Sequence, residues 1–194
     1  MKRTMYNTPI LRQIITPLCH FCLKLNGWKL KGEPPKAPKY VLIAAPHTSN
    51  WDFPIALAIA FIYRFDMHWM GKDSLFKGWR GPIMRWMGGI PIIRSSSNNV
   101  VAQTIDTFKT SDRLVVAVPP EGTRSKVDKW KTGFYYIALG ANVPIALAFL
   151  DYTNKTGGFL STFYPTGDAE KDIAAMRASY AGISGKHVNQ CSVE

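Results

Sequence analysis

Short apolar runs alternate with helical segments along the middle of the chain, and this alternation most constrains the fold. Residues 40–45, 114–118 and 144–150 are continuous apolar stretches, which is typical of strands buried on both faces of a parallel sheet. Helical segments separate them. We therefore predict an α/β fold, a single domain with a mixed, largely parallel sheet flanked by helices and preceded by an N-terminal amphipathic helical segment.

The other expected elements occupy the remainder of the region between residues 40 and 180. We predict helices over residues 53–63, 99–109, 133–139 and 169–180, strands over 67–70, 90–93 and 159–164, short helical pieces over 73–87 and a hairpin turn over 154–158. Pro54 suits the first turn of its helix. A chain of 194 residues is long enough for one domain with a substantial core.

The N-terminal region carries apolar residues at helical spacing. They are Leu11, Ile14, Ile15, Leu18, Phe21, Cys22, Leu25 and Trp28. This pattern predicts one or two amphipathic helices, with a kink or restart at Thr16-Pro17. No apolar run reaches the roughly 18 residues that a membrane span requires, and no small-residue cleavage site marks a signal peptide. Two interpretations stay open: the stripe docks on a membrane surface, which we favour, or it packs on the sheet as core.

These patterns divide the chain into three parts. We expect N-terminal membrane-docking helices over residues 1–32, the main domain over 33–182 and a loose C-terminal tail over 183–194.

The charge balance points to an anionic partner. Lys and Arg total 24 against 13 acidic residues, a formal net charge of +11. Such a surplus suits nucleic acid, an anionic lipid surface or phosphorylated substrates. Three cysteines are no disulfide framework, and the pair Cys19 and Cys22 has the spacing of half a zinc site with no second ligand pair. We expect neither disulfides nor a bound metal.

His47 and Asp52 form the first candidate for chemistry. They lie between a predicted buried strand and a helix start, where open α/β sheets place ligand sites. Across such a turn the carboxylate can hold one imidazole nitrogen and leave the other as a general base. The alternative is that Asp52 or Asn50 caps the helix and His47 is an ordinary loop residue. The residues alone leave both open.

Two further segments follow predicted strands and could bind an anion. Arg94 comes directly after one strand, and Gly122, Thr123 and Arg124 follow another. Glycine permits close backbone approach, and the threonine hydroxyl and the arginine fork suit phosphate. An ordinary solvated strand end and an ordinary polar turn are the alternatives.

Taken together, these segments resemble the glycerolipid acyltransferase superfamily, which includes lysophosphatidate and glycerol-3-phosphate acyltransferases. The resemblance rests on four motifs in the family's order, namely His47 with Asp52, residues 88–94 with a Gly-x5-Arg pattern, Glu121-Gly122-Thr123-Arg124, and Val143-Pro144-Ile145. It covers roughly residues 40–151. Lys131 and Gly133 match residues that commonly follow the third motif. Each motif is weak alone, but their order and their places at strand ends make the set specific.

The resemblance implies a role for each matched residue. It makes His47 the catalytic base and Asp52 its orienting partner. It places Arg94, Glu121, Gly122, Thr123 and Arg124 in the acceptor site, with arginine on phosphate, and Pro144 near the acyl-binding region. Pro119 departs from the family, which usually has an aromatic residue at that position, and the chain is shorter than typical members. The acceptor pocket and the acyl-binding region could therefore differ in shape and size.

The expected function is acyl transfer from acyl-CoA or acyl-carrier protein to the hydroxyl of a lyso-glycerolipid such as 1-acyl-glycerol-3-phosphate, with no cofactor. We expect a peripheral protein on the cytoplasmic face of a membrane, where basic and aromatic residues between 72 and 86 suit the lipid interface. Another lyso-lipid acceptor is one alternative. A non-catalytic basic protein that binds membranes or nucleic acid is another, although no nucleic-acid motif is present and we expect no nucleic-acid partner.

Overall fold

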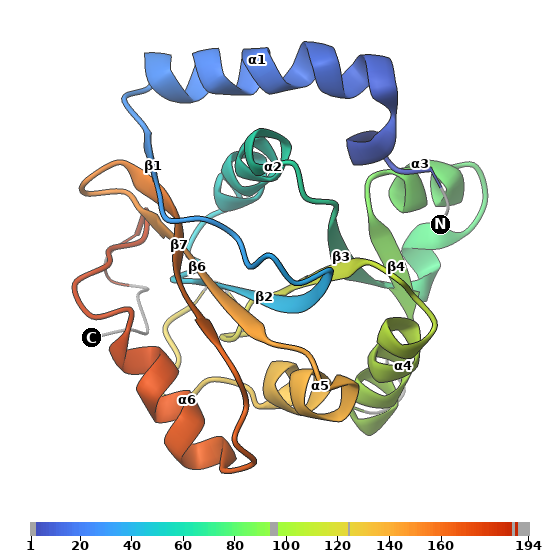
Figure 1. The fold of residues 1–194 in the computed structure, drawn as a ribbon, viewed down its shortest axis with the longest axis vertical. Coiled ribbons are helices and arrows are strands. Elements are labelled where there is room, and N and C mark those ends of the chain that lie inside the picture. The colour runs from blue at the N-terminus through green and yellow to red at the C-terminus, as the bar shows by residue number, and fades with distance from the viewer. Residues whose placement is uncertain (1–2, 94–96, 124, 188, 190–194) are drawn as a thin grey trace.

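A seven-stranded sheet forms the centre of the molecule (Figure 1). The structure, a computed structural model, describes residues 3–93, 97–123, 125–187 and 189. The strands are β1 (Lys29–Lys31), β2 (Lys39–Ala45), β3 (Met67–Lys72), β4 (Gly89–Ile92), β5 (Leu114–Val118), β6 (Ile145–Asp151) and β7 (Thr156–Phe163), in the order β1-β7-β6-β2-β5-β3-β4. Neighbouring strands are parallel except for the β6–β7 hairpin. The predicted α/β fold with a mixed, largely parallel sheet is confirmed.

Helices cover both faces of the sheet. They are α1 (Pro9–Leu25), α2 (Asp52–Tyr63), α3 (Arg80–Trp86), α4 (Ser97–Lys109), α5 (Gly133–Ala141) and α6 (Ala169–Ala178), with short 3-10 turns η1 (Met5–Asn7) and η2 (Asp73–Phe76). In Figure 1, α1 and α2 lie on one side of the sheet and α4, α5 and α6 on the other. Because side chains alternate along a strand, β2 feeds both cores: Val41 and Ile43 pack toward α5, and Tyr40 and Leu42 toward α2.

Helix α1 packs on the core along one side and is exposed along the other, so membrane docking of its exposed side stays a prediction. It runs unbroken through Pro17, so no restart occurs there. Leu11, Ile15, Cys19 and Leu23, spaced four apart, pack in the core beneath the helix. Ile10, Ile14, Leu18, Phe21 and Leu25 are all more than half exposed on its other side. The helix therefore contributes to the core and also presents an apolar stripe to the surroundings.

Strand β1 was not predicted from the sequence. It is only three residues long and reads Lys-Leu-Lys, so it carries no apolar run. It pairs in parallel with β7, where a Cβ on Gly158 would lie 2.1 Å from the carbonyl oxygen of Lys31. Gly157 and Gly158 were predicted to be part of a turn, but they lie in β7. The glycine at 158 permits the close approach of the neighbouring backbone.

The expectation of a loose tail after residue 182 is wrong for its described part. Ile183 packs against the main core. The carbonyl oxygen of Ser184 accepts the backbone N–H of Tyr152 at 2.9 Å, and the backbone N–H of His187 donates to the hydroxyl of Thr48 at 3.2 Å. These contacts join residues that are far apart in the sequence, so no local sequence pattern predicts them. Residues 188 and 190–194 of the predicted tail lie outside the described residues.

The described helices include none that unites the length and the apolar character needed to cross a bilayer.

Candidate active site

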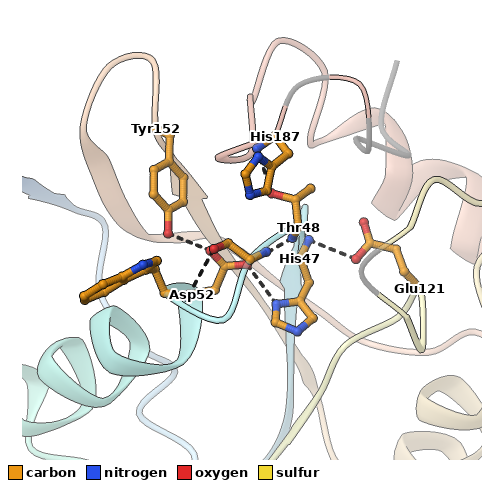
Figure 2. A network of polar contacts seen from close by, with 8 residues as sticks. His47, Thr48, Asp52, Glu121, Tyr152 and His187 are labelled. Atoms are coloured by element: carbon orange, nitrogen blue, oxygen red, sulfur yellow. Dashed lines mark hydrogen bonds and ion pairs between the residues drawn. The ribbon is translucent and has the colours of Figure 1, made fainter.

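Three adjacent strands end at one edge of the sheet and bring distant residues together. The order β6-β2-β5 places the segments that follow these strands side by side. His47 and Asp52 come after β2, Glu121 after β5 and Tyr152 after β6. The carboxyl ends of parallel strands are where open α/β sheets bind ligands. Figure 2 shows these four side chains gathered at this edge.

His47 and Asp52 meet as the spacing suggested. The Nδ1 atom of His47 lies 2.9 Å from Oδ2 of Asp52. The same oxygen accepts the backbone N–H groups of Thr48 at 3.0 Å and Ser49 at 2.9 Å. Asp52 is the first residue of α2. It therefore holds the imidazole and organises the turn before the helix. The N-cap of α2 is Trp51, without a side-chain capping hydrogen bond, so Asp52 does not cap the helix.

The surroundings of Asp52 keep it ionised. Burial raises its pKa, but hydrogen bonds from His47, Tyr152 and the backbone of Ser49 outweigh this effect, and the net pKa lies below the usual value. A carboxylate can only accept hydrogen bonds, so Nδ1 of His47 carries the proton in this pair. The side chain of His47 is 28% exposed, against 8% for Asp52. The second ring nitrogen is thus left to act as a general base.

Glu121 lies on the far side of the His47 backbone (Figure 2). Its Oε2 atom accepts the backbone N–H of His47 at 2.9 Å, and the residue is only 1% exposed. Burial raises the pKa of this carboxyl to about 7, although the hydrogen bond from His47 opposes the shift. The family resemblance assigned Glu121 to the acceptor site. In the structure its described contact is with the turn that carries the base.

The other predicted site residues are divided between the two edges of the sheet. Gly122 and Thr123 are exposed in the loop after β5, next to Glu121, and Gly122 has a φ of +67° with the Lys131 side chain against it. Arg94 and Arg124 lie outside the described residues. Pro144 directly precedes β6, at the amino edge of the sheet, where its carbonyl accepts the N–H of Val41. The structure does not bring Pro144 together with His47.

An apolar cavity of about 740 Å³ adjoins the His–Asp pair. It lies between α2 and the sheet, and its wall includes His47 and Asp52. Small residues leave this room, and they include Ala44, Ala56, Ala117, Ala148 and Gly158. Phe53 and Leu75 line the cavity and are also exposed, so they mark a place where it reaches the surface. The cavity suits a long apolar chain whose reactive end lies at the histidine.

Comparison with known proteins identifies the family. A family model described as Acyltransferase matches residues 29–147, more than half of the chain. The chain belongs to the acyltransferase family. The predicted resemblance to glycerolipid acyltransferases is thereby confirmed at the level of the family. A search among curated protein sequences gave no significant match.

The acyltransferase also shares its fold with a solved structure. This is the crystal structure of the 1-acyl-sn-glycerophosphate (LPA) acyltransferase PlsC from Thermotoga maritima. The TM-score is 0.58 and the sequence identity 16%, over 90% of this chain and 82% of that chain. At this identity the similarity concerns the fold.

Sequence reasoning missed two features of the acyltransferase site. Tyr152 donates its hydroxyl to Oδ1 of Asp52 at 2.6 Å, from a position 100 residues away in the chain. One signal was available, because Tyr152 directly follows the end of a strand next to β2. The contact of Glu121 with the backbone of His47 was the second. Polar side chains beyond the ends of neighbouring strands would have pointed to both.

Proposed function

We propose that this acyltransferase moves a fatty acyl group from acyl-CoA or acyl-carrier protein to the hydroxyl of a lyso-glycerolipid, with 1-acyl-glycerol-3-phosphate as the first candidate. The observation that carries the proposal is the His47–Asp52 pair in the wall of an apolar cavity of about 740 Å³. Small-molecule sites typically enclose roughly 300–1,000 Å³. A cavity of this volume with an apolar lining has room for an acyl chain.

The proposed reaction uses the pair as a general base. The free nitrogen of His47 takes the proton of the acceptor hydroxyl, and the hydroxyl oxygen attacks the carbonyl carbon of the thioester. Asp52 stabilises the imidazolium that forms. The tetrahedral intermediate collapses with cleavage of the carbon–sulfur bond, and the departing thiolate receives the proton from His47. An ester and a free thiol result, without a covalent enzyme intermediate.

The choice of acceptor is supported by the motifs and by the fold. The protein of known structure that shares this fold is an LPA acyltransferase. In this chain, Gly122 and Thr123 are exposed beside the His47 turn. We propose that they bind the acceptor together with Arg94 and Arg124, whose roles rest on the motif resemblance alone. Two arginines would hold a phosphate through charge-assisted hydrogen bonds.

A lipid acceptor requires the enzyme to work at a membrane surface, and we propose peripheral binding at the cytoplasmic face. The exposed stripe of α1 is one contact. A second is the η2–α3 region, whose exposed side chains are Leu75, Trp79, Ile83 and Trp86, with Lys77, Arg80 and Arg85 between them. Leu75 also lines the cavity. The formal net charge of +11 favours anionic lipid headgroups.

The test is thiol release from acyl-CoA or acyl-carrier protein, measured with a panel of acceptors that share an acyl chain and differ in headgroup. Acceptor-dependent release of thiol, with the acylated product seen by mass spectrometry, supports the proposal. His47→Ala should slow it by roughly two to four orders of magnitude, whereas His20→Ala, which changes an exposed histidine outside the cavity wall, should not slow it. Thiol release at the same rate with and without each hydroxyl acceptor would contradict the proposal.

A further inference from the structure

Tyr152 completes the surroundings of the catalytic carboxylate. The Oδ2 atom of Asp52 contacts His47, Thr48 and Ser49. The Oδ1 atom receives the Tyr152 hydroxyl at 2.6 Å. Asp52 is 6% exposed, so water has little access to replace a lost donor. Loss of this hydroxyl would leave a buried carboxylate oxygen without its hydrogen bond, which is costly for a charged group.

The ring of Tyr152 is itself held in place from two sides. Trp28, just after α1, contacts it edge to face, with ring centroids 5.1 Å apart and an interplanar angle of 87°. The backbone N–H of Tyr152 donates to Ser184 in the C-terminal segment at 2.9 Å. Aromatic pairs of this geometry are favourable. The segments that fix the hydroxyl thus come from both ends of the chain.

We propose that Tyr152 is a positioning residue of the acyl-transfer reaction: its hydroxyl orients Asp52 and thereby His47, and Trp28 holds its ring. The inference deepens the proposed function and rests on it for the identity of the reaction. Tyr152 acts through Asp52 and takes no part in proton transfer. Residues that orient a catalytic pair in this way affect the chemical step more than the binding of either substrate.

The first experiment compares two single-atom deletions. Tyr152→Phe removes the hydroxyl and keeps the ring against Trp28. Tyr63→Phe is the matched control. The Tyr63 hydroxyl also donates a hydrogen bond of 2.6 Å, to the carbonyl oxygen of Gly32, and the Tyr63 ring also packs edge to face, against Phe159. We expect Tyr152→Phe to lower kcat about tenfold, with less than about a twofold change in either KM. Tyr63→Phe should leave kcat and both KM values unchanged.

The second measurement is the pH profile of the Asp52 carboxyl itself, with its side-chain carbon-13 NMR resonance followed against pH. The Tyr152 hydrogen bond lowers the pKa of Asp52, so its removal should move this titration to higher pH in Tyr152→Phe. Asp52 also interacts electrostatically with His47 and Glu121, while Lys186 and His187 lie against Trp51 and Thr48. A loss of packing alone would leave the pKa of Asp52 unchanged.

A third measurement needs no substrate. The proton on Nδ1 of His47, held by Asp52, should give a downfield NMR resonance in the wild-type protein. Tyr152→Phe should broaden or shift it, and Tyr63→Phe should not. Trp28→Ala keeps the Tyr152 hydroxyl but removes the contact that holds the Tyr152 ring. It should lower kcat by less than Tyr152→Phe does.

The outcomes separate this inference from the proposed function. If the wild-type protein transfers acyl groups and Tyr152→Phe matches it in kcat, pH profile and the His47 resonance, Tyr152 has no positioning role. If the wild-type protein transfers no acyl group to any hydroxyl acceptor, the proposed function fails, and the His47 resonance still decides whether Tyr152 supports Asp52. Equal losses of kcat in Tyr152→Phe and Tyr63→Phe would also overturn the inference.

Discussion

Asp52 lies five positions after His47 and accepts hydrogen bonds on both of its carboxylate oxygens. Its carboxylate accepts hydrogen bonds from backbone N–H groups of the turn, from the His47 ring and from the Tyr152 hydroxyl. Glu121 holds the backbone of His47 from the other side. His47 is therefore fixed at its ring and at its backbone by groups from three strand ends, and this is the preorganisation that the proposed catalytic pair needs.

At the residue scale, the first prediction concerns Asp52. Asp52→Asn keeps the size of the side chain but removes its charge, so the imidazolium formed during the reaction is no longer stabilised. His47→Ala should lower the rate by roughly two to four orders of magnitude, and Asp52→Asn by less. Steady-state kinetics with a water-soluble acceptor and circular dichroism on the same samples check both. A folded His47→Ala protein of near-normal rate would disprove the mechanism.

The second prediction concerns the charge of Glu121. The pKa of this carboxyl is about 7 in the folded chain and 4.5 ordinarily, so between these values the folded state keeps a proton that the unfolded state loses. The free energy of unfolding should therefore fall as pH rises through this window, by roughly 3 kcal/mol in total, and stay level above it.

Glu121→Gln tests this effect, because the amide can still accept the His47 N–H but does not titrate. Urea unfolding at pH 5.5 and 8.5 should show a smaller loss of stability in the variant than in the wild-type protein. Glu33→Gln, at an exposed position, is the control and should follow the wild type. If wild type and Glu121→Gln lose the same stability over this range, the carboxyl does not carry a raised pKa.

At the scale of elements, α1 shows how one helix can serve the core and the surface together. Its inward residues join the core that lies on α2, and its outward stripe has no partner among the described residues. The sequence left docking and packing open as alternatives because both require apolar residues at helical spacing. Helix α1 therefore carries apolar residues on its inward and on its outward side.

The third prediction uses this division of α1. Leu23 is 8% exposed and Leu25 is 73% exposed, so they form a matched pair two residues apart. Leu23→Ala should lower the free energy of unfolding by about 2–4 kcal/mol, whereas Leu25→Ala should change it by less than about 0.5 kcal/mol. Thermal and urea unfolding measure both. A chain that starts near Gly32 should likewise unfold or aggregate, since it lacks α1 and β1.

At the scale of the whole molecule, the apolar surfaces and the charge act together. The α1 stripe and the η2–α3 region expose large apolar side chains, and the chain carries a formal net charge of +11. Exposed apolar residues beside basic ones favour an anionic lipid surface. The cavity reaches the surface at Leu75 in η2, so we propose that a lipid substrate enters it from the proposed membrane-facing surface.

The fourth prediction is that the protein binds anionic vesicles in a way that salt weakens without abolishing. Raising the salt from about 0.1 M to 1 M shortens the Debye length from about 10 Å to about 3 Å and screens the basic residues. The double variant Ile14→Ser/Phe21→Ser should reduce binding at high salt, because the apolar contact then dominates. Vesicle sedimentation measures this, with neutral vesicles as the control. Unchanged binding by the double variant would exclude α1 as the anchor.

The sequence by itself determined the order of most helices and strands and the α/β class, and it offered the pairing of His47 with Asp52 as one of two alternatives. These depend on local patterns, such as apolar runs and the turn between a strand and a helix, and such patterns involve only residues that are close together in the sequence. Only the tertiary structure revealed the contacts of Tyr152 and Glu121, strand β1 and the cavity. Tyr152 lies 100 residues from Asp52 in the chain, and Glu121 lies 74 residues from His47. Such contacts depend on which strands become neighbours in the sheet, and that order is a property of the packed molecule as a whole.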